Sequence, residues 1–239
     1  KQDWQYYMNS QHTVKFGYNA IYHSFIPGSV TGNATTSLVS SDIPKRYALE
    51  NAAYLSDEWA VSEKLKITAG LRISNFNQLG PTTIYGFDED GTITDTTVYK
   101  NNENIKTYWG IEPRLSASFM LNESSSIKAS YARTQQYLHL LSNATSYQST
   151  DLWIPSSNIV KPQIGDQYAI GYFKNFADNL FETSVEVYYK TMQNQIEYKN
   201  GAQFVLNKTA EADLVFGKGK SYGIELFAKK RYGKFNGWI

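Results

Sequence analysis

The side chains best suited to binding gather in one stretch, residues 134–165. It contains Tyr137, His139, Tyr147, Asp151 and Trp153. Exposed aromatic rings beside polar groups suit the capture of sugar rings or apolar ligands. Loops carry binding residues more often than the scaffold that supports them. We therefore predict ligand contacts at these five positions. The alternative is a stretch that folds on itself and packs over the end of the scaffold.

The sequence supports a catalytic site or a metal site less strongly than it supports ligand binding. Ser142, His139 and Asp151 supply the residue types of a hydrolase triad, but proximity along a chain does not establish triad geometry. Residues 88–92, Asp-Glu-Asp-Gly-Thr, resemble half of a calcium loop that lacks its closing glutamate, and they also suit a turn. We expect no enzyme activity, no catalytic residue, no metal site and no cofactor.

Composition narrows the function classes further. The 239 residues carry a formal net charge of +1, which gives no electrostatic argument for nucleic acid. The absence of cysteine excludes disulfide frameworks and thiolate chemistry. No apolar stretch approaches the ~20 residues of a transmembrane helix. The mean hydropathy of −0.46 is typical of soluble proteins, but hydropathy does not detect barrels, because half of each strand faces a polar lumen.

The elements that must position these side chains are β-strands. Residues 65–74 show the alternation of apolar and polar residues typical of a strand most clearly. Leu65, Ile67, Ala69, Leu71 and Ile73 alternate with polar or small residues. Successive side chains of a strand point to opposite faces, so one face of this strand is apolar and the other polar. A tight connection, residues 60–64, precedes the strand and follows Trp59. We expect Trp59 to lie at a membrane interface on the side of the short turns.

Alternation of this kind recurs and predicts eight complete strands. Their ranges are 12–23, 47–59, 65–76, 106–120, 126–133, 166–173, 181–190 and 221–229. Short connections alternate with long ones without exception, and in outer-membrane barrels short turns are periplasmic and long loops extracellular. Pro113 cannot donate to a sheet ladder, so we predict a β-bulge there, with a wrong strand assignment as the alternative.

The two ends of the sequence resemble parts of further strands, residues 4–8 and 236–239. We therefore predict an all-β fold: an antiparallel transmembrane β-barrel segment of about eight to nine strands, cut from a larger barrel at both ends. Residues 1–239 form one partial outer-membrane barrel domain in this interpretation. A soluble β-sandwich also alternates, but it seldom places long connections at every second position.

Several short motifs resemble one family in their order and spacing. AYLSDEW at 53–59, followed by KLKITAGLR at 64–72, resembles the AYLQDEW…LTLNAGLR hairpin of TonB-dependent outer-membrane receptors. IEPRLS at 111–116 and IKASYAR at 127–133 are similar to the two strands that follow there. DLWIPS at 151–156, KPQ at 161–163, EVYYK at 186–190 and GIEL at 223–226 are similar to versions common in Bacteroidetes.

This resemblance implies a barrel of about 22 strands with a plug, in the outer membrane of a Gram-negative bacterium. It further implies TonB-energised uptake of a scarce nutrient: a siderophore, glycan, peptide or vitamin. The implied partners are the TonB complex, the plug of the same polypeptide, outer-membrane lipid and a surface lipoprotein. Neither a plug domain nor a TonB box is present in these residues, so transport belongs to the parent protein.

One set of charged residues falls on the polar side of the predicted strands. We expect it to line the lumen and to contact the plug through charge-assisted bonds, or to be solvated and paired within itself. The set comprises Lys66, Arg72, Glu112, Arg114, Lys128, Glu182, Glu186 and Glu225. Two other functions stay open: a non-transporting surface barrel or adhesin that binds a partner through its long loops, and an outer-membrane hydrolase, which is least favoured.

Overall fold

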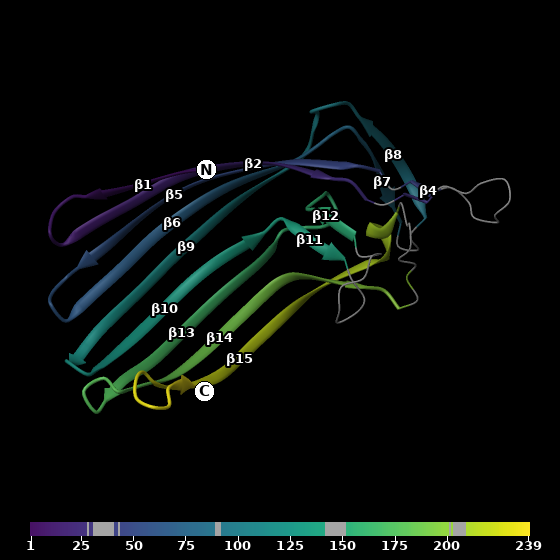
Figure 1. Cartoon of the computed structure of the whole chain (residues 1–239). Coiled ribbons are helices and arrows are strands. Elements are labelled where there is room, and N and C mark those ends of the chain that lie inside the picture. The colour runs from purple at the N-terminus through teal and green to yellow at the C-terminus, as the bar shows by residue number, and fades with distance from the viewer. Residues whose placement is uncertain are drawn as a thin grey trace.

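The computed structural model describes residues 1–27, 29–30, 41–42, 44–88, 92–141, 152–200, 202 and 209–239. Among these residues, ten strands form a single antiparallel sheet (Figure 1). In sheet order they are β1 (Gln2–Tyr7), β2 (His12–Phe25), β5 (Arg46–Ala60), β6 (Leu65–Leu79), β9 (Asn104–Asn122), β10 (Ser125–Gln136), β13 (Gln163–Phe176), β14 (Phe181–Tyr198), β15 (Leu214–Lys230) and β16 (Gly237–Trp238). The predicted all-β antiparallel fold is confirmed, with a strand at each predicted position.

Short and long connections lie at opposite ends of this sheet. The turns after β1, β5, β9 and β13 gather at one end in Figure 1, whereas the long connections project from the other. We call these the short-turn end and the long-loop end. Additional hairpins lie in the long connections: β3 (Ser29–Val30) with β4 (Ser41–Asp42), β7 (Thr82–Phe87) with β8 (Ile93–Tyr99), and β11 (Leu138–Leu141) with β12 (Leu152–Pro155). A 3-10 turn, η1 (Ala210–Asp213), precedes β15. No helix among the described residues is long and apolar enough to span a membrane.

Strand register gives the sheet two different faces. Val187 pairs with Ile170 on one side and Ile224 on the other, and this row belongs to what we call the apolar face. The neighbouring row joins Glu186 to Gly171 and Glu225, on the opposite polar face. Because alternation has a strict period of two, one register shift would exchange the faces, so the hydrophobic pattern fixes the pairing.

Acidic, basic and histidine side chains on the apolar face are confined to its two ends. Across the described strands β2 to β15, alternation places His12, Asp57, Lys174 and Lys230 near the short-turn end, and Arg133, Asp166, Lys218 and Lys220 near the long-loop end. On β13 the uncharged interval runs from Lys174 to Asp166, ~27 Å along the strand. With a strand tilt of about 40°, the height of this interval along the membrane normal is ~20 Å, close to the height of the apolar band of a membrane barrel.

The tight connection after Trp59 lies where the sequence predicts it. Trp59 is on the apolar face, directly opposite His12, and the two rings stack with centroids 5.4 Å apart. His12 Nδ1 is 2.6 Å from Asp57 Oδ2 on the same face. An aromatic ring beside polar groups at the edge of an apolar band is typical of a membrane interface.

Pro113 does not produce the predicted bulge. It pairs with Leu71 in a β6–β9 ladder whose register is unshifted at this position. The β9–β10 ladder ends at the neighbouring pair, Arg114 with Ala132. A proline that lies just beyond this ladder has no bond to donate to β10, so it is accommodated without an extra residue.

Candidate functional site

The charged residues predicted for the lumen share the polar face. Arg72 pairs with Glu112, and Lys66 with Ser118. The same alternation places the whole predicted set on this face: Lys66, Arg72, Glu112, Arg114, Lys128, Glu182, Glu186 and Glu225. Their contact with a plug stays a prediction.

Arg72 lies at the centre of a buried charge cluster. Its Nη1 donates to Glu112 Oε1 at 2.5 Å, and its Nη2 donates to Glu50 Oε1 at 3.2 Å. The Glu112 side chain is only 2% exposed. His23 Nε2 lies 3.5 Å from the other carboxylate oxygen of Glu50. One guanidinium thus serves two carboxylates from neighbouring strands, and this geometry holds β5, β6 and β9 together on the polar face.

An aromatic stack covers this cluster on the side of the long loops. The rings of Phe76 and Tyr137 lie 4.8 Å apart and are nearly parallel, at 2°. The Tyr137 hydroxyl is 2.8 Å from Ser74 Oγ and donates to Gln135 Oε1 at 3.0 Å. Gly110 makes room for this contact, because a Cβ there would lie 2.5 Å from the Tyr137 hydroxyl. With 3% of its surface exposed, Tyr137 joins β10 to β6 beyond the point where the β9–β10 ladder stops.

His139 is also buried, within the β11–β12 hairpin. It is 1% exposed, and its Nε2 lies 2.9 Å from Ser156 Oγ, whereas no partner reaches Nδ1 among the described residues. Burial lowers the pKa of His139 to about 4, since the charged imidazolium loses its hydration. The ring is therefore neutral at neutral pH.

The remaining predicted residues of this stretch are placed in different ways. Trp153 is 48% exposed on β12. Tyr147 and Asp151 lie outside the described residues, as does Ser142 of the candidate triad. Ligand contact by the five predicted residues stays a prediction. The calcium-like segment is described only at its margins, where Asp88 Oδ1 accepts a hydrogen bond from the Thr92 amide, as in a turn.

The long connections fold onto one another at the long-loop end. A small apolar core joins the connection after β10 to the connection after β14, and Leu152, Ile196 and Tyr198 pack against it. Its buried members are Leu141, Ile154, Val160, Ala210 and Leu214. These connections therefore form a packed layer with its own buried surface.

Glu211 links η1 to β5 and to the segment after β12 through its two carboxylate oxygens. One carboxylate oxygen pairs with Arg46 at the start of β5, and the other accepts a hydrogen bond from Ser157 Oγ at 2.7 Å. Tyr108 on β9 donates to the Ser157 carbonyl at 2.7 Å. Glu211 and Arg46 are 165 positions apart and both are largely buried. No local pattern in the sequence indicates this link.

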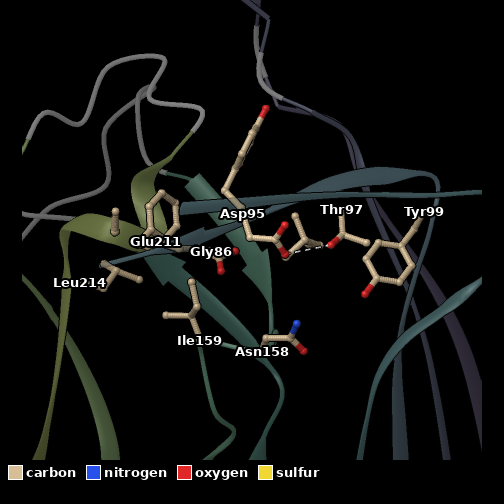
Figure 2. Close-up of a pocket in the computed structure, with 12 residues that line it drawn as sticks. Gly86, Asp95, Thr97, Tyr99, Asn158, Ile159, Glu211 and Leu214 are labelled. Atoms are coloured by element: carbon tan, nitrogen blue, oxygen red, sulfur yellow. Dashed lines mark hydrogen bonds between the residues drawn. The ribbon is translucent and has the colours of Figure 1, made fainter. Parts of the chain in front are cut away.

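A cavity of about 370 Å³ opens beside Glu211, between the β7–β8 hairpin and the segment after β12 (Figure 2). Its polar groups include Asp95, Thr97 and Asn158, and its aromatic walls include Tyr85 and Tyr99. No arginine, lysine or histidine is among the described residues that line it. Residues 93–99 are rich in β-branched and aromatic side chains, and this composition is a sequence signal for β8.

Comparison with known proteins matches residues 1–238 to the family described as TonB dependent receptor-like, beta-barrel. The chain belongs to this family. Its members are β-barrels of the Gram-negative outer membrane, so the family accounts for the two faces of the sheet. Among curated proteins no relative matches the sequence.

Several solved structures share the fold of this receptor segment. The FrpB iron transporter from Neisseria meningitidis (F3-3 variant) is 16% identical, with a TM-score of 0.62, over 97% of this chain and 32% of that chain. The ferric-catecholate import receptor Fiu from K12 E. coli is 14% identical, with a TM-score of 0.58, over 97% and 34%. The copper transporter OprC is 13% identical, with a TM-score of 0.62, over 97% and 35%. The receptor segment spans about a third of each of these chains.

Proposed function

We propose that this chain forms part of the wall of a TonB-dependent outer-membrane transporter that takes up a scarce nutrient. The observation that carries the proposal is the family match over residues 1–238. The sheet supports it physically, because one face is uncharged over most of its height and the other is densely charged. Such a wall suits lipid on one side and a hydrated lumen on the other.

The polar face supports a proposal for the partner inside the barrel. Arg114 on this face is 58% exposed, in contrast to the buried Glu112 beside it. Lys66 and Lys128 lie on the same face nearer the short-turn end. Exposed cations of this kind suit charge-assisted bonds to a plug of the same polypeptide. We further propose TonB, outer-membrane lipid and a surface lipoprotein as partners of the whole protein.

The cargo belongs to the class of scarce nutrients: siderophores, glycans, peptides or vitamins. The titles of the similar solved structures name iron, ferric catecholate and copper for those proteins. The polar and aromatic cavity at the long-loop end is the described feature of this chain best placed to meet a ligand from outside.

We propose no catalytic activity for this chain. His139 is enclosed with Ser156, which is 0% exposed, so neither side chain reaches a substrate in this arrangement. A nucleophile and its base need access to the reacting carbonyl. The pair therefore serves to hold β11 against the segment after β12.

Uptake by the parent bacterium tests the proposed function. A strain without the gene is compared with the same strain carrying the full-length wild-type gene, and each receives labelled ferric catecholate, copper, an oligosaccharide, a peptide or a corrinoid vitamin. Uptake of one of these should be lost on deletion, restored by the gene and abolished by an uncoupler. Unchanged uptake of all five would reject transport, and a change in surface adhesion alone would support a non-transporting barrel.

A further inference from the structure

We infer that the outer edge of β8 binds an extended peptide with a basic side chain, and that Asp95 is the partner of that side chain. The inference rests on the proposed transport function, because it names the class of cargo that meets the long-loop end. The bound peptide is an added strand of the β7–β8 hairpin.

The first observation is an exposed strand edge. Among the described residues β8 pairs with β7 alone, and the two strands form a sheet separate from the ten-stranded one (Figure 1). Six of the seven residues of β8 are exposed, whereas every residue of β7 is half-buried. In an antiparallel pair, every second residue points its amide and carbonyl groups away from the partner strand. The outer side of β8 therefore presents a row of backbone donors and acceptors.

The second observation is that β8 lacks the usual protection of an edge strand. Natural edges avoid pairing with other chains through lysine, proline, a bulge or a covering segment. Residues 93–99, Ile-Thr-Asp-Thr-Thr-Val-Tyr, contain no lysine and no proline. The register shift of this hairpin lies between Gly86 and Phe87, so the ladder is regular from Asp95 to Tyr99. A regular edge rich in β-branched residues suits the addition of a strand.

The third observation is that one face of β8 forms a wall of the cavity of about 370 Å³ at the long-loop end. Asp95, Thr97 and Tyr99 follow one another along this wall in Figure 2. Thr96 and Val98, which alternate with them, do not line the cavity. A strand added to the outer edge of β8 directs every second side chain to the cavity side. Main-chain bonds then supply affinity, and the cavity selects among these alternate side chains.

Charge complementarity identifies the side chain that the cavity selects. Asp95 is the one acidic or basic residue of β8. Its carboxylate accepts a 3.4 Å hydrogen bond from the Thr97 hydroxyl and has no ion-pair partner among the described residues. Glu211, the other carboxylate of the described cavity wall, is paired with Arg46. A lysine or arginine side chain therefore compensates Asp95, whereas an acidic side chain meets repulsion.

Fluorescence anisotropy of the purified full-length protein with labelled heptapeptides tests this site. The probe length matches the seven residues of β8, ~20 Å of extended chain. The probes TVTKTVT and TVTETVT differ only at the central residue, whose side chain shares a face with the two valines. Attraction and repulsion at an exposed charge each change the affinity by up to about fivefold, so the lysine probe should bind about 5- to 25-fold more tightly.

A charge reversal in the protein tests the role of Asp95. D95K should reverse the preference, so that the glutamate probe binds more tightly than the lysine probe. T96K is the matched control, because it adds the same side chain to the exposed opposite face of β8. It should keep the preference of the wild type for lysine. A preference that D95K leaves unchanged would overturn the inference, as would equal binding of the two probes to the wild type.

Methylated probes test the addition of a strand directly. A strand pairs with its neighbour through every second amide, so N-methyl groups on the amides of one parity of the lysine probe should abolish binding. The same groups on the amides of the other parity point away from β8 and should leave the affinity nearly unchanged. Equal binding of the two methylated probes would contradict pairing along the edge of β8.

Two other occupants of the edge give different results. Binding of maltoheptaose in place of every peptide probe would assign the cavity to a glycan and overturn the inference. A dimer in light scattering that excludes the probes would assign the edge to a second copy of the protein and also overturn it. Uptake of another nutrient with no probe binding would reject this site alone, whereas probe binding without any uptake would reject only transport.

Discussion

Arg72 and Glu112 face each other across the β6–β9 ladder and are joined by a 2.5 Å hydrogen bond, although Glu112 is almost completely buried. Arg72 also reaches Glu50 on the opposite neighbour, β5. A buried carboxylate that loses its cation cannot recover its hydration. Arg72 is therefore the central residue of the cluster, because it donates hydrogen bonds to both carboxylates.

We predict that R72M lowers the free energy of unfolding by about 3–5 kcal/mol, because it removes the nearest cation from Glu112, which is 2% exposed, and a second hydrogen bond from the largely buried Glu50. Equilibrium unfolding of the full-length protein in detergent measures this loss. R114M is the matched control: Arg114 is 58% exposed and lies 4.0 Å from Glu112, so the cost should be about 0–1 kcal/mol. The double variant R72M/E112Q should recover part of the loss, and equal costs for R72M and R114M would contradict the buried cluster.

A second prediction concerns the close contact at Gly110. G110A introduces a Cβ that overlaps Ser74 Oγ and lies 2.5 Å from the Tyr137 hydroxyl, so the stack of Tyr137 on Phe76 must move. We expect a loss of about 1–3 kcal/mol in unfolding free energy and a changed near-ultraviolet circular dichroism spectrum. G217A is the control, since nothing lies within 4 Å of its new Cβ. A G110A protein as stable as G217A would show that the stack is not tightly packed.

The third prediction tests the link between Glu211 and Arg46. E211Q removes the ion pair but keeps an acceptor for Ser157, so we expect the connection before β15 to open locally. Protease added to intact cells should then cut the long-loop end faster, while the unfolding midpoint of the barrel stays the same. E197Q, an exposed position at the end of β14, should leave the cleavage rate unchanged. Equal cleavage of E211Q and wild type would reject the link.

The fourth prediction follows from the lowered pKa of His139, about 4 in the folded hairpin against 6.5 for a free imidazole. Between these values the unfolded hairpin binds more protons than the folded one, so stability is complete above pH 6.5 and declines as the pH falls toward 4. The total loss is about 3 kcal/mol. Hydrogen exchange of β11–β12 should therefore accelerate on acidification. H139Q should abolish this pH dependence, whereas H12Q at the short-turn end should retain it.

Alternation of polar and apolar residues predicts the strand bounds well at the short-turn end and less well at the long-loop end. The structure extends β14 to Tyr198, where alternation predicts an end at 190, and starts β15 at Leu214, where alternation predicts 221. Within the membrane the two faces meet different solvents, so the pattern is strong. Beyond the membrane both faces of a strand meet water or loops, and Lys218 and Lys220 occupy positions of β15 that face the same way as Tyr222, where alternation predicts apolar residues.

The site was less predictable than the fold because its contacts join distant parts of the chain. Alternation indicates that Arg72 and Glu112 share a face, but only the register brings them opposite each other. Nothing local connects Glu211 to Arg46. Tyr137 and His139 suggest ligand contacts by residue type, and those contacts stay a prediction. Their burial has no local signal, because Tyr137 stacks on Phe76 of β6 and His139 lies beside Ser156, 17 positions further along the chain.

The last prediction tests which face of the sheet meets lipid. Val187 lies in the middle of the apolar face between Ile170 and Ile224. V187K places an ammonium in the hydrocarbon layer, and we expect a loss of about 2–4 kcal/mol when the full-length protein folds into vesicles. S130K adds the same side chain to the polar face, where Ser130 is exposed next to Ser116, so its cost should be small. A larger cost for S130K than for V187K would mean that the lumen and lipid faces are exchanged.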